Sequence, residues 1–194
     1  MQRHSLARSA YELIAEGGFE HLRTREVAAR AGVNVATLHY YFPTKEDLVR
    51  AVMERLDQEF AAAYDPAAAA GPESSSPLEE LRTDLADGLY QTRVSPQTWV
   101  VWFELVMRSL RDASVRAPVQ EALAHWRAHI EAYLVAGVQQ GIFRADLDIQ
   151  AASAGLVALI NGSALQVLSD PGAFPAARLA AEVERRLAPE MPLS

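Results

Sequence analysis

Lys45 stands where a positive side chain would meet the free N–H groups at the start of a helix. Pro43 ends the segment before it, because the residue preceding a proline disfavours helical backbone. Thr44 is a good N-cap residue and Asp47 follows three positions later, a spacing typical of a capping box. Free backbone N–H groups, the positive end of the helix dipole and a lysine ammonium together suit a phosphate. This position therefore predicts phosphate binding.

A second set of polar and aromatic side chains precedes Lys45. Asn34 can cap a short helix in which Leu38 and Phe42, four residues apart, share one face. That face is expected to be buried, so the remaining side chains stay free to contact a partner. They are Thr37, His39, Tyr40 and Tyr41.

Positioning these side chains requires two short helices joined by a tight turn. Thr24 can cap the first helix, whose apolar face is formed by Val27, Ala28 and Ala31. Gly32 then supplies the permissive backbone that a sharp turn needs. The pattern predicts a helix-turn-helix with a core at residues 24–43.

Residues 24–48 resemble the DNA-binding signature of TetR/AcrR-type transcriptional regulators. The shared features are an Ala-Gly-Val step, a Thr-Leu pair, an aromatic cluster, and Phe, Lys and Leu at this spacing. The resemblance implies phosphate contacts by Thr24, Tyr41 and Lys45, a base contact by Arg25, and a major-groove face lined by Val35, Ala36, Thr37, His39 and Tyr40. His39 stands where the family usually has tyrosine, and Tyr41 where it often has histidine. These exchanges predict a different operator sequence more than a loss of DNA binding.

The net charge of −7 is unusual for a protein that binds DNA, but its distribution is uneven. Residues 1–55 carry a net charge of +1, and the remainder carries −8. DNA binding would then depend on a local cluster of cations and should be steeply salt-dependent. The alternative is that these cations only form a solvated surface. They are Arg3, Arg8, Arg23, Arg25, Arg30 and Lys45.

The composition of the 194-residue chain is that of an ordinary globular protein, with 50% hydrophobic and 22% charged residues. It has no cysteine, which excludes disulfides and Cys-ligated metal sites. Charged residues interrupt the first twenty positions, so no signal segment is predicted and a cytoplasmic location is expected. No GxSxG, HExxH or glycine-rich phosphate loop is present, and neither an enzyme nor a bound cofactor is expected.

The rest of the chain predicts an all-α fold in two parts. A helix with an apolar stripe through Leu6 and Ile14 ends at Gly17-Gly18 and should brace the helix-turn-helix. The helix that starts at Thr44 should run through Phe60, and the proline- and serine-bearing stretch 65–77 reads as a linker or loop. We therefore assign residues 1–50 to a three-helix DNA-binding domain. Residues 51–194 form a helical ligand-binding and dimerisation domain.

Helix-start signals recur through this second part. Ser76-Pro77 and Ser95-Pro96 each combine an N-cap residue with a proline in the first turn, and Asp148 and Pro175 open the last two helices. The segment 99–107 is apolar all round, so it should be buried or line a cavity.

Residues 149–168 carry no charge, which raises the alternative of a membrane span. Scattered polar residues and many alanines and glycines favour close helix–helix contact instead. The TetR-like resemblance implies that residues 149–187 form a two-fold four-helix interface, so we expect a homodimer that reads two inverted half-sites and has no membrane partner.

Aromatic and apolar side chains of the second part could line a pocket for a small apolar or amphipathic effector, or serve only as core. They are Leu85, Trp99, Trp102, Phe103, Met107, Trp126 and Tyr133. Glu104 is the one charge in its apolar segment: it either pairs with Arg108 at the surface or faces the pocket, where it would attract a cation. The region from Trp99 to Leu168 resembles the C-terminal part of choline-responsive BetI-type repressors, which favours a cationic ligand.

His125 and His129, with Glu121 one turn earlier, have the spacing of a metal pair, but the same spacing is common on solvated helix faces, and we predict no metal. The sequence as a whole predicts a ligand-responsive DNA-binding repressor that binds a palindromic operator as a dimer. The alternative is a helical ligand-binding protein of the same fold without specific DNA binding. Arg25, Thr37 and Lys45 argue against this alternative.

Overall fold

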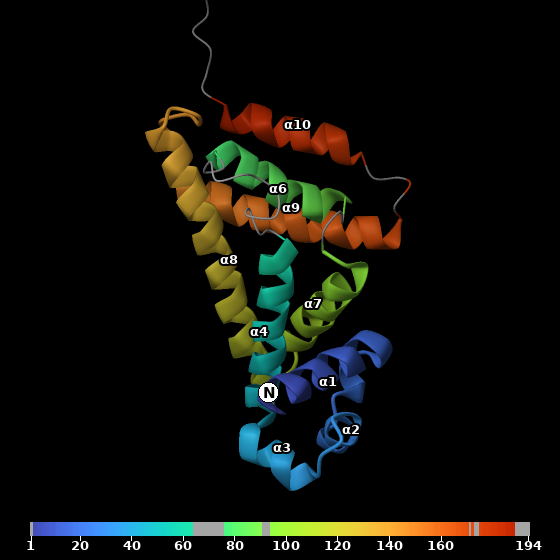
Figure 1. Ribbon diagram of the computed structural model, residues 1–194. Coiled ribbons are helices and arrows are strands. Elements are labelled where there is room, and N and C mark those ends of the chain that lie inside the picture. The colour runs from blue at the N-terminus through green and yellow to red at the C-terminus, as the bar shows by residue number, and fades with distance from the viewer. Residues whose placement is uncertain (1, 64–75, 91–93, 171, 173–174, 189–194) are drawn as a thin grey trace, which may run out of the picture. The chain divides into compact units, whose positions relative to one another are not determined.

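The computed structural model describes residues 2–63, 76–90, 94–170, 172 and 175–188. All regular elements in these ranges are helices (Figure 1). In chain order they are α1 (Gln2–Gly17), the 3-10 helix η1 (Phe19–His21), α2 (Thr24–Arg30), α3 (Val35–Tyr41), α4 (Lys45–Ala63), α6 (Pro77–Tyr90), α7 (Pro96–Ser109), α8 (Ala113–Gln139), α9 (Ile149–Ser169) and α10 (Ala176–Leu187). The all-α prediction is confirmed. Most of the predicted linker at 65–77 lies outside the described residues.

The helices fall into two compact units. The first unit comprises Met1–Ala62 and Ser95–Leu123, the second Ala63–Val94 and Ala124–Ser194, and α8 contributes to both. This division does not coincide with a boundary at residue 50, because most of α4, all of α7 and the start of α8 cluster with the helix-turn-helix. The functional division into residues 1–50 and 51–194 stays a prediction.

Helix α1 forms the centre of the first unit. Leu6, Ala10 and Ile14 recur along one face of it and are completely buried. This face packs against α2, η1 and α7, and the Tyr11 hydroxyl and the Thr98 hydroxyl of α7 are hydrogen-bonded at 3.1 Å. The helix ends at Gly17, where Gly18 takes a positive φ of 76°. The predicted helix over the N-terminal residues is confirmed.

Helix α7 starts as predicted, with the Ser95 hydroxyl accepting the Thr98 N–H at 3.2 Å. Its inner face is buried, including Trp99, whose ring packs edge-on against Phe60 of α4 at 5.0 Å. Residues 99–107 are not buried on all sides, since Met107 is 61% exposed, and the alternative that they line a cavity stays a prediction. The reason is geometric: α7 packs through one face on α1 and α4, so apolar side chains at other positions around the helix are left at the surface of the chain.

In the second unit α6 lies against both α9 and α10 (Figure 1). The Arg82 guanidinium of α6 forms a bidentate ion pair with the Glu184 carboxylate of α10, with Nε–Oε1 and Nη2–Oε2 distances of 2.9 and 3.0 Å. Leu81 and Leu85 of α6 and Ile160 of α9 are fully buried or nearly so. Apolar packing thus holds these helices together, and the ion pair adds a polar link between α6 and α10.

Helix α9 is long and apolar enough to cross a membrane by length and composition alone, the one such helix in the described part of the chain. Its start is confirmed, because the Asp148 carboxylate accepts the Ala151 N–H at 3.0 Å. Core helices of soluble proteins have the same length and composition, so these two properties are weak evidence that α9 crosses a membrane.

Candidate nucleic-acid interface

The turn between α2 and α3 depends on Gly32. Its φ of +69° lies in the left-handed region, which a residue without a Cβ enters at no steric cost. The Val33 N–H donates to the Ala28 carbonyl at 3.0 Å and closes the turn. Val27 and Ala28 of α2 and Leu38 of α3 are at most 1% exposed. The predicted helix-turn-helix is therefore present, with its apolar residues turned inward.

Helix α3 begins at a well-formed cap. The Asn34 side-chain oxygen accepts from both the N–H and the hydroxyl of Thr37, at 2.7 and 3.1 Å. Phe42 after the helix is buried, as predicted, whereas Tyr40 is 80% exposed. The Tyr40 and Tyr41 rings meet edge-on at 5.2 Å. Ala36, His39, Tyr40 and Tyr41 are exposed, and Val35 and Thr37 are partly so.

Two residues at the start of α2 behave differently from each other. The sequence suggested that Thr24 caps the helix, and this prediction is wrong. Arg23 occupies the N-cap position and makes no side-chain capping bond. The helix simply starts one residue earlier than a threonine cap would require. Arg25 is exposed and has no carboxylate within ion-pair distance among the residues that the structure describes. Its guanidinium is thus available to a base edge.

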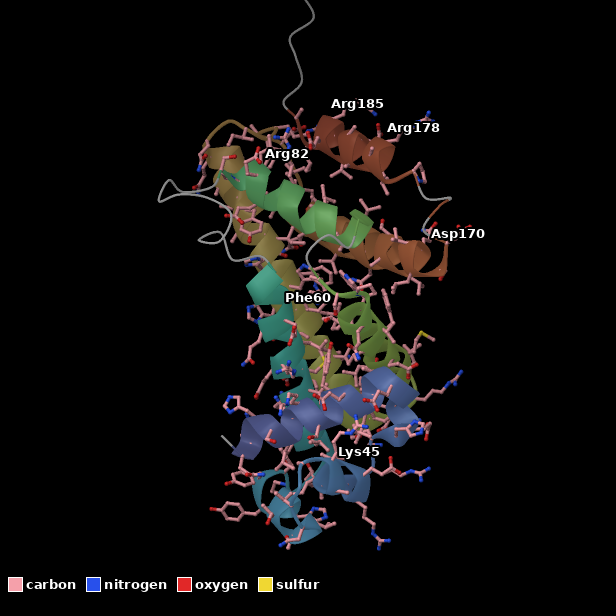
Figure 2. All side chains as sticks on the ribbon, turned by 45° about the vertical axis from the view of Figure 1, so that its right-hand side comes forward. Lys45, Phe60, Arg82, Asp170, Arg178 and Arg185 are labelled. Carbon is pink, nitrogen blue, oxygen red and sulfur yellow. The ribbon has the colours of Figure 1, made fainter. Side chains whose placement is uncertain are left out.

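Lys45 is the first residue of α4 (Figure 2). The predicted capping box before it is formed: Thr44 donates its N–H and its hydroxyl to the Asp47 carboxylate, at 2.9 and 2.6 Å, and the Asp47 N–H donates to the Thr44 hydroxyl oxygen at 3.1 Å. The bond from the Thr44 hydroxyl is the main cause of the lowered pKa of Asp47. Local sequence therefore fixes the place of Lys45 at the helix N-terminus.

Five of the six cations predicted to form the local cluster around the motif have a carboxylate partner within the chain, and their role in DNA binding stays a prediction. The pairs are Arg3–Glu54 at 2.8 Å, Arg8–Glu12 at 3.7 Å, Arg23–Glu26 at 3.6 Å, Arg30–Glu16 at 2.6 Å and Lys45–Asp112 at 3.6 Å. Exposed pairs of this kind are weak and can exchange for phosphate. Two of these partners lie within one helical turn along the chain, whereas folding brings the other three from distant positions.

Two neighbours of Lys45 were not predicted from the sequence. The Lys45 ammonium lies 4.4 Å from the centroid of the Phe19 ring and 3.6 Å from an oxygen of Asp112, in the turn between α7 and α8. Both partners are distant in sequence, so periodicity carries no signal for the contact.

The residues suggested for an effector pocket belong to both units. Trp99, Trp102, Phe103, Glu104 and Met107 lie in the first, and Leu85, Trp126 and Tyr133 in the second. Trp99 stacks on Phe103 at 5.9 Å, as in a packed core. The pocket therefore stays a prediction.

Glu104 has a partner that the sequence did not suggest. Its carboxylate accepts the Phe19 N–H at 3.1 Å, at the first residue of η1. Arg108, the alternative partner, instead reaches Glu20 at 2.6 Å and Asp112 at 3.1 Å. The expected Glu104–Arg108 pair is thus wrong, and Glu104 ties η1 to α7.

The two histidines of α8 do not share Glu121, which accepts from Arg50 of α4 instead. The ring of His129 packs edge-on against Tyr133 at 4.6 Å and is hydrogen-bonded to its hydroxyl. Partial burial and the neighbouring His125 lower the pKa of His129. In the part of the chain that the structure describes, no group of three metal-ligating residues is brought together.

An all-α protein that presents a capped, outward-facing helix after a Gly32 turn, with a lysine at the next helix start, is a helix-turn-helix DNA-binding protein. Residues 6–52 match the family model of bacterial regulatory proteins of the tetR family. Residues 77–191 match that of the C-terminal part of BetI-type transcriptional repressors. The chain belongs to the TetR family of bacterial transcriptional regulators and is not an enzyme. The second match covers α9, which is therefore a helix of the C-terminal part and not a membrane span.

Individual relatives agree with this assignment. The chain is 25% identical over 162 residues to the HTH-type transcriptional regulator BetI of Rhizobium meliloti (strain 1021), covering 84% of this chain and 75% of the relative. The fold is similar to that of a TetR-family transcriptional regulator from Rhodococcus sp., with a TM-score of 0.83 and 20% identity over 96% of this chain and 98% of the other. A transcriptional regulator from Saccharomonospora viridis, solved in complex with choline, has a TM-score of 0.72 and 24% identity over 94% and 93% of the two chains.

Proposed function

We propose that this regulator is a repressor that binds a palindromic operator as a homodimer, through two copies of residues 24–45, and leaves it when a small molecule binds. The single observation that carries DNA binding is the division of α3: Leu38 is completely buried while His39, Tyr40 and Tyr41 face outward. Such a division leaves one face of the recognition helix for base edges and phosphates. A regulator of this family binds DNA inside the bacterial cell, so the proposed place of action is the cytoplasm.

Dimerisation through residues 149–187 is supported by the surface of α9. Beyond the adjacent backbone of α9 itself, an added Cβ at Gly155 or Gly162 would meet no heavy atom of the described chain within 4 Å. Alanines at 151, 154 and 158 are also exposed, and Leu165 is 50% exposed. A helix face that is apolar, small and open favours close approach of a second copy. To read a palindromic operator, a two-fold dimer must place its two recognition helices about 34 Å apart, one turn of B-DNA.

The effector is proposed to be small and either cationic or apolar. A cation is favoured by the BetI-type family match and by the similar regulator that was solved with choline. Aromatic faces bind quaternary ammonium groups well. To release the operator, the effector must bind the DNA-incompetent conformation more tightly than the competent one.

The test of DNA binding is fluorescence anisotropy with labelled DNA from immediately upstream of the protein's own gene, at about 50 and 200 mM salt, with a scrambled duplex as competitor. Specific binding that weakens steeply with salt is the expected result. Equal affinity for the scrambled duplex at both salt concentrations contradicts an operator at this locus and leaves two alternatives, an operator elsewhere or a fold kept for ligand binding alone.

The test of the effector uses the same complex. Choline is titrated against its neutral isostere 3,3-dimethylbutan-1-ol, in which carbon replaces the quaternary nitrogen. Release by choline alone supports a cationic effector, and release by both supports an apolar one. If neither displaces the DNA, both of these ligands are excluded as inducers.

A further inference from the structure

Lys45 is held between groups from two other segments of the first unit. Its ammonium lies 3.6 Å from Oδ2 of Asp112 and 4.4 Å from the centroid of the Phe19 ring. The lysine side chain remains 42% exposed. The ammonium therefore has an anion and a ring beside it and an open side toward solvent.

Asp112 is fixed in place by its own neighbours. The hydroxyl and the N–H of Ser114 donate to Oδ1 at 2.7 and 3.1 Å, and the Arg108 Nε donates to Oδ2 at 3.1 Å. The Ser114 hydroxyl is the largest cause of a pKa lowered to about 2, to which Arg108 and Lys45 also contribute. With a side chain only 19% exposed and a lowered pKa, Asp112 is an anchored anion that is charged at neutral pH.

We infer that Asp112 is an internal competitor of DNA for Lys45: its carboxylate partners the lysine in the free protein, and a DNA phosphate takes its place in the complex. The inference rests on the proposed role of Lys45 as a phosphate contact. A charge-assisted hydrogen bond between these groups would be about 2.7–2.9 Å long, so the 3.6 Å contact is loose enough to exchange.

The Phe19 ring gives the exchange its geometry. Phe19 is 4% exposed, and its backbone N–H donates to the Glu104 carboxylate. Lys45 and Arg108 approach it at 4.4 and 4.9 Å. Its attraction for the ammonium does not depend on Asp112, so Lys45 stays near the helix N-terminus when the carboxylate is lost or outcompeted.

Competition of this kind has a defined signature. A phosphate carries no sequence information, so Asp112 lowers affinity for operator and scrambled DNA by the same factor. Replacing Asp112 by a neutral side chain of the same shape should therefore tighten binding to both operator and scrambled DNA. This gain should depend on Lys45.

The experiment is a double-mutant cycle with D112N and K45A, measured by anisotropy on both duplexes. Asparagine keeps the side-chain oxygen that accepts from Ser114, and D112S is a second variant should D112N unfold. D112N should bind both duplexes roughly 2- to 5-fold more tightly, the range of an exposed ion pair. In the K45A background the gain should vanish.

E20Q is the matched control. Glu20 pairs with Arg108 beside Asp112 and is 79% exposed, so E20Q removes one charge nearby without removing a partner of Lys45. A D112N gain no larger than that of E20Q overturns the inference, as does a gain that persists in K45A, which would mean direct repulsion of DNA. Weaker binding by D112N also overturns it, since Asp112 would then position Lys45. Failure of the unaltered protein to bind either duplex overturns the proposed function and this inference together.

Discussion

Arg25 and Lys45 carry the same charge, but we expect them to meet different parts of the DNA. Arg25 is exposed and unpaired within the described residues, which suits a base edge, whereas Lys45 sits at a helix N-terminus, which suits a phosphate. Arg25→Ala should cost about 1–3 kcal/mol on the operator and little on a scrambled duplex. Lys45→Ala should weaken binding to both and reduce the salt slope by about 1.

The comparison is made by anisotropy titrations at several salt concentrations. Arg23→Ala is a suitable control, because Arg23 is a neighbouring exposed cation to which the family resemblance assigns no DNA contact. Equal losses on operator and scrambled DNA for Arg25→Ala would remove its base-reading role.

Glu104 offers a second test at the residue scale. Its carboxylate accepts the Phe19 N–H, and Gly18 beside it has a φ of 76°. Glu104→Ala would leave that N–H unsatisfied and should lower the free energy of unfolding by about 1–3 kcal/mol, while Glu104→Gln, which keeps an acceptor, should lower it less. Denaturant unfolding measures the difference. An unchanged unfolding curve with a lost choline response would instead favour the pocket carboxylate.

The structural features that could be predicted well from the sequence were local ones. Asn34, Ser95 and Asp148 cap their helices as expected, because a cap depends on residues within one turn. The neighbours of Lys45 and of Glu104 were not predicted, since they come from other segments of the chain and are set by packing.

At the scale of the element, the end of α8 depends on two glycines for different reasons. A Cβ on Gly137 would overlap the Phe143 ring, which is 3% exposed and has little room to move. Gly141 has open space around it but a φ of +71°. Gly137→Ala should cost about 1–3 kcal/mol by overpacking and Gly141→Ala about 1–2 kcal/mol by backbone strain.

Denaturant unfolding of paired variants separates the two causes. Phe143→Ala opens space beside Gly137, so adding Gly137→Ala to it should cost far less than in the native background. Full additivity of the two changes would contradict the overlap. Gly141→Asn should be tolerated better than Gly141→Ala, because asparagine enters left-handed backbone more readily.

The contact between α6 and α10 should make their association depend on pH. The Arg82 side chain is the main cause of the lowered pKa of Glu184. A carboxylate whose pKa falls on folding stabilises the folded state at pH values above its unfolded-state pKa. This stabilisation is lost as the pH drops through the pKa of the folded state. The melting temperature of the native protein should therefore exceed that of Glu184→Gln at pH 7, and the gap should narrow toward pH 4. A difference in melting temperature that is constant with pH would mean that the Arg82–Glu184 ion pair adds no charge-dependent stability.

At the scale of the whole molecule, the sequence predicted the class of fold but not how the helices group. Helical periodicity and the caps sufficed for an all-α chain with an N-terminal helix-turn-helix. The clustering of α7 with the DNA-binding helices was missed, because an apolar run such as residues 99–107 shows that a helix needs a partner without showing which one. Exposed Met107 shows the limit of the same argument, since composition does not reveal which side of the helix is covered.

Dimerisation is the property of the whole molecule on which operator binding depends. Ala158 is exposed in the middle of α9, on the open face proposed to meet a second copy. Ala158→Arg should leave the fold of the single chain intact, because the side chain points to solvent there, but it would bury an unpaired charge in the interface, which costs several kcal/mol. We expect light scattering to show a monomer, and operator affinity to fall far more than affinity for a single half-site, because only the dimer engages two half-sites at once. Ala132→Arg, at an exposed alanine of α8 outside residues 149–187, is the control and should remain dimeric. If Ala158→Arg is a dimer with native operator affinity, the interface lies elsewhere on the chain.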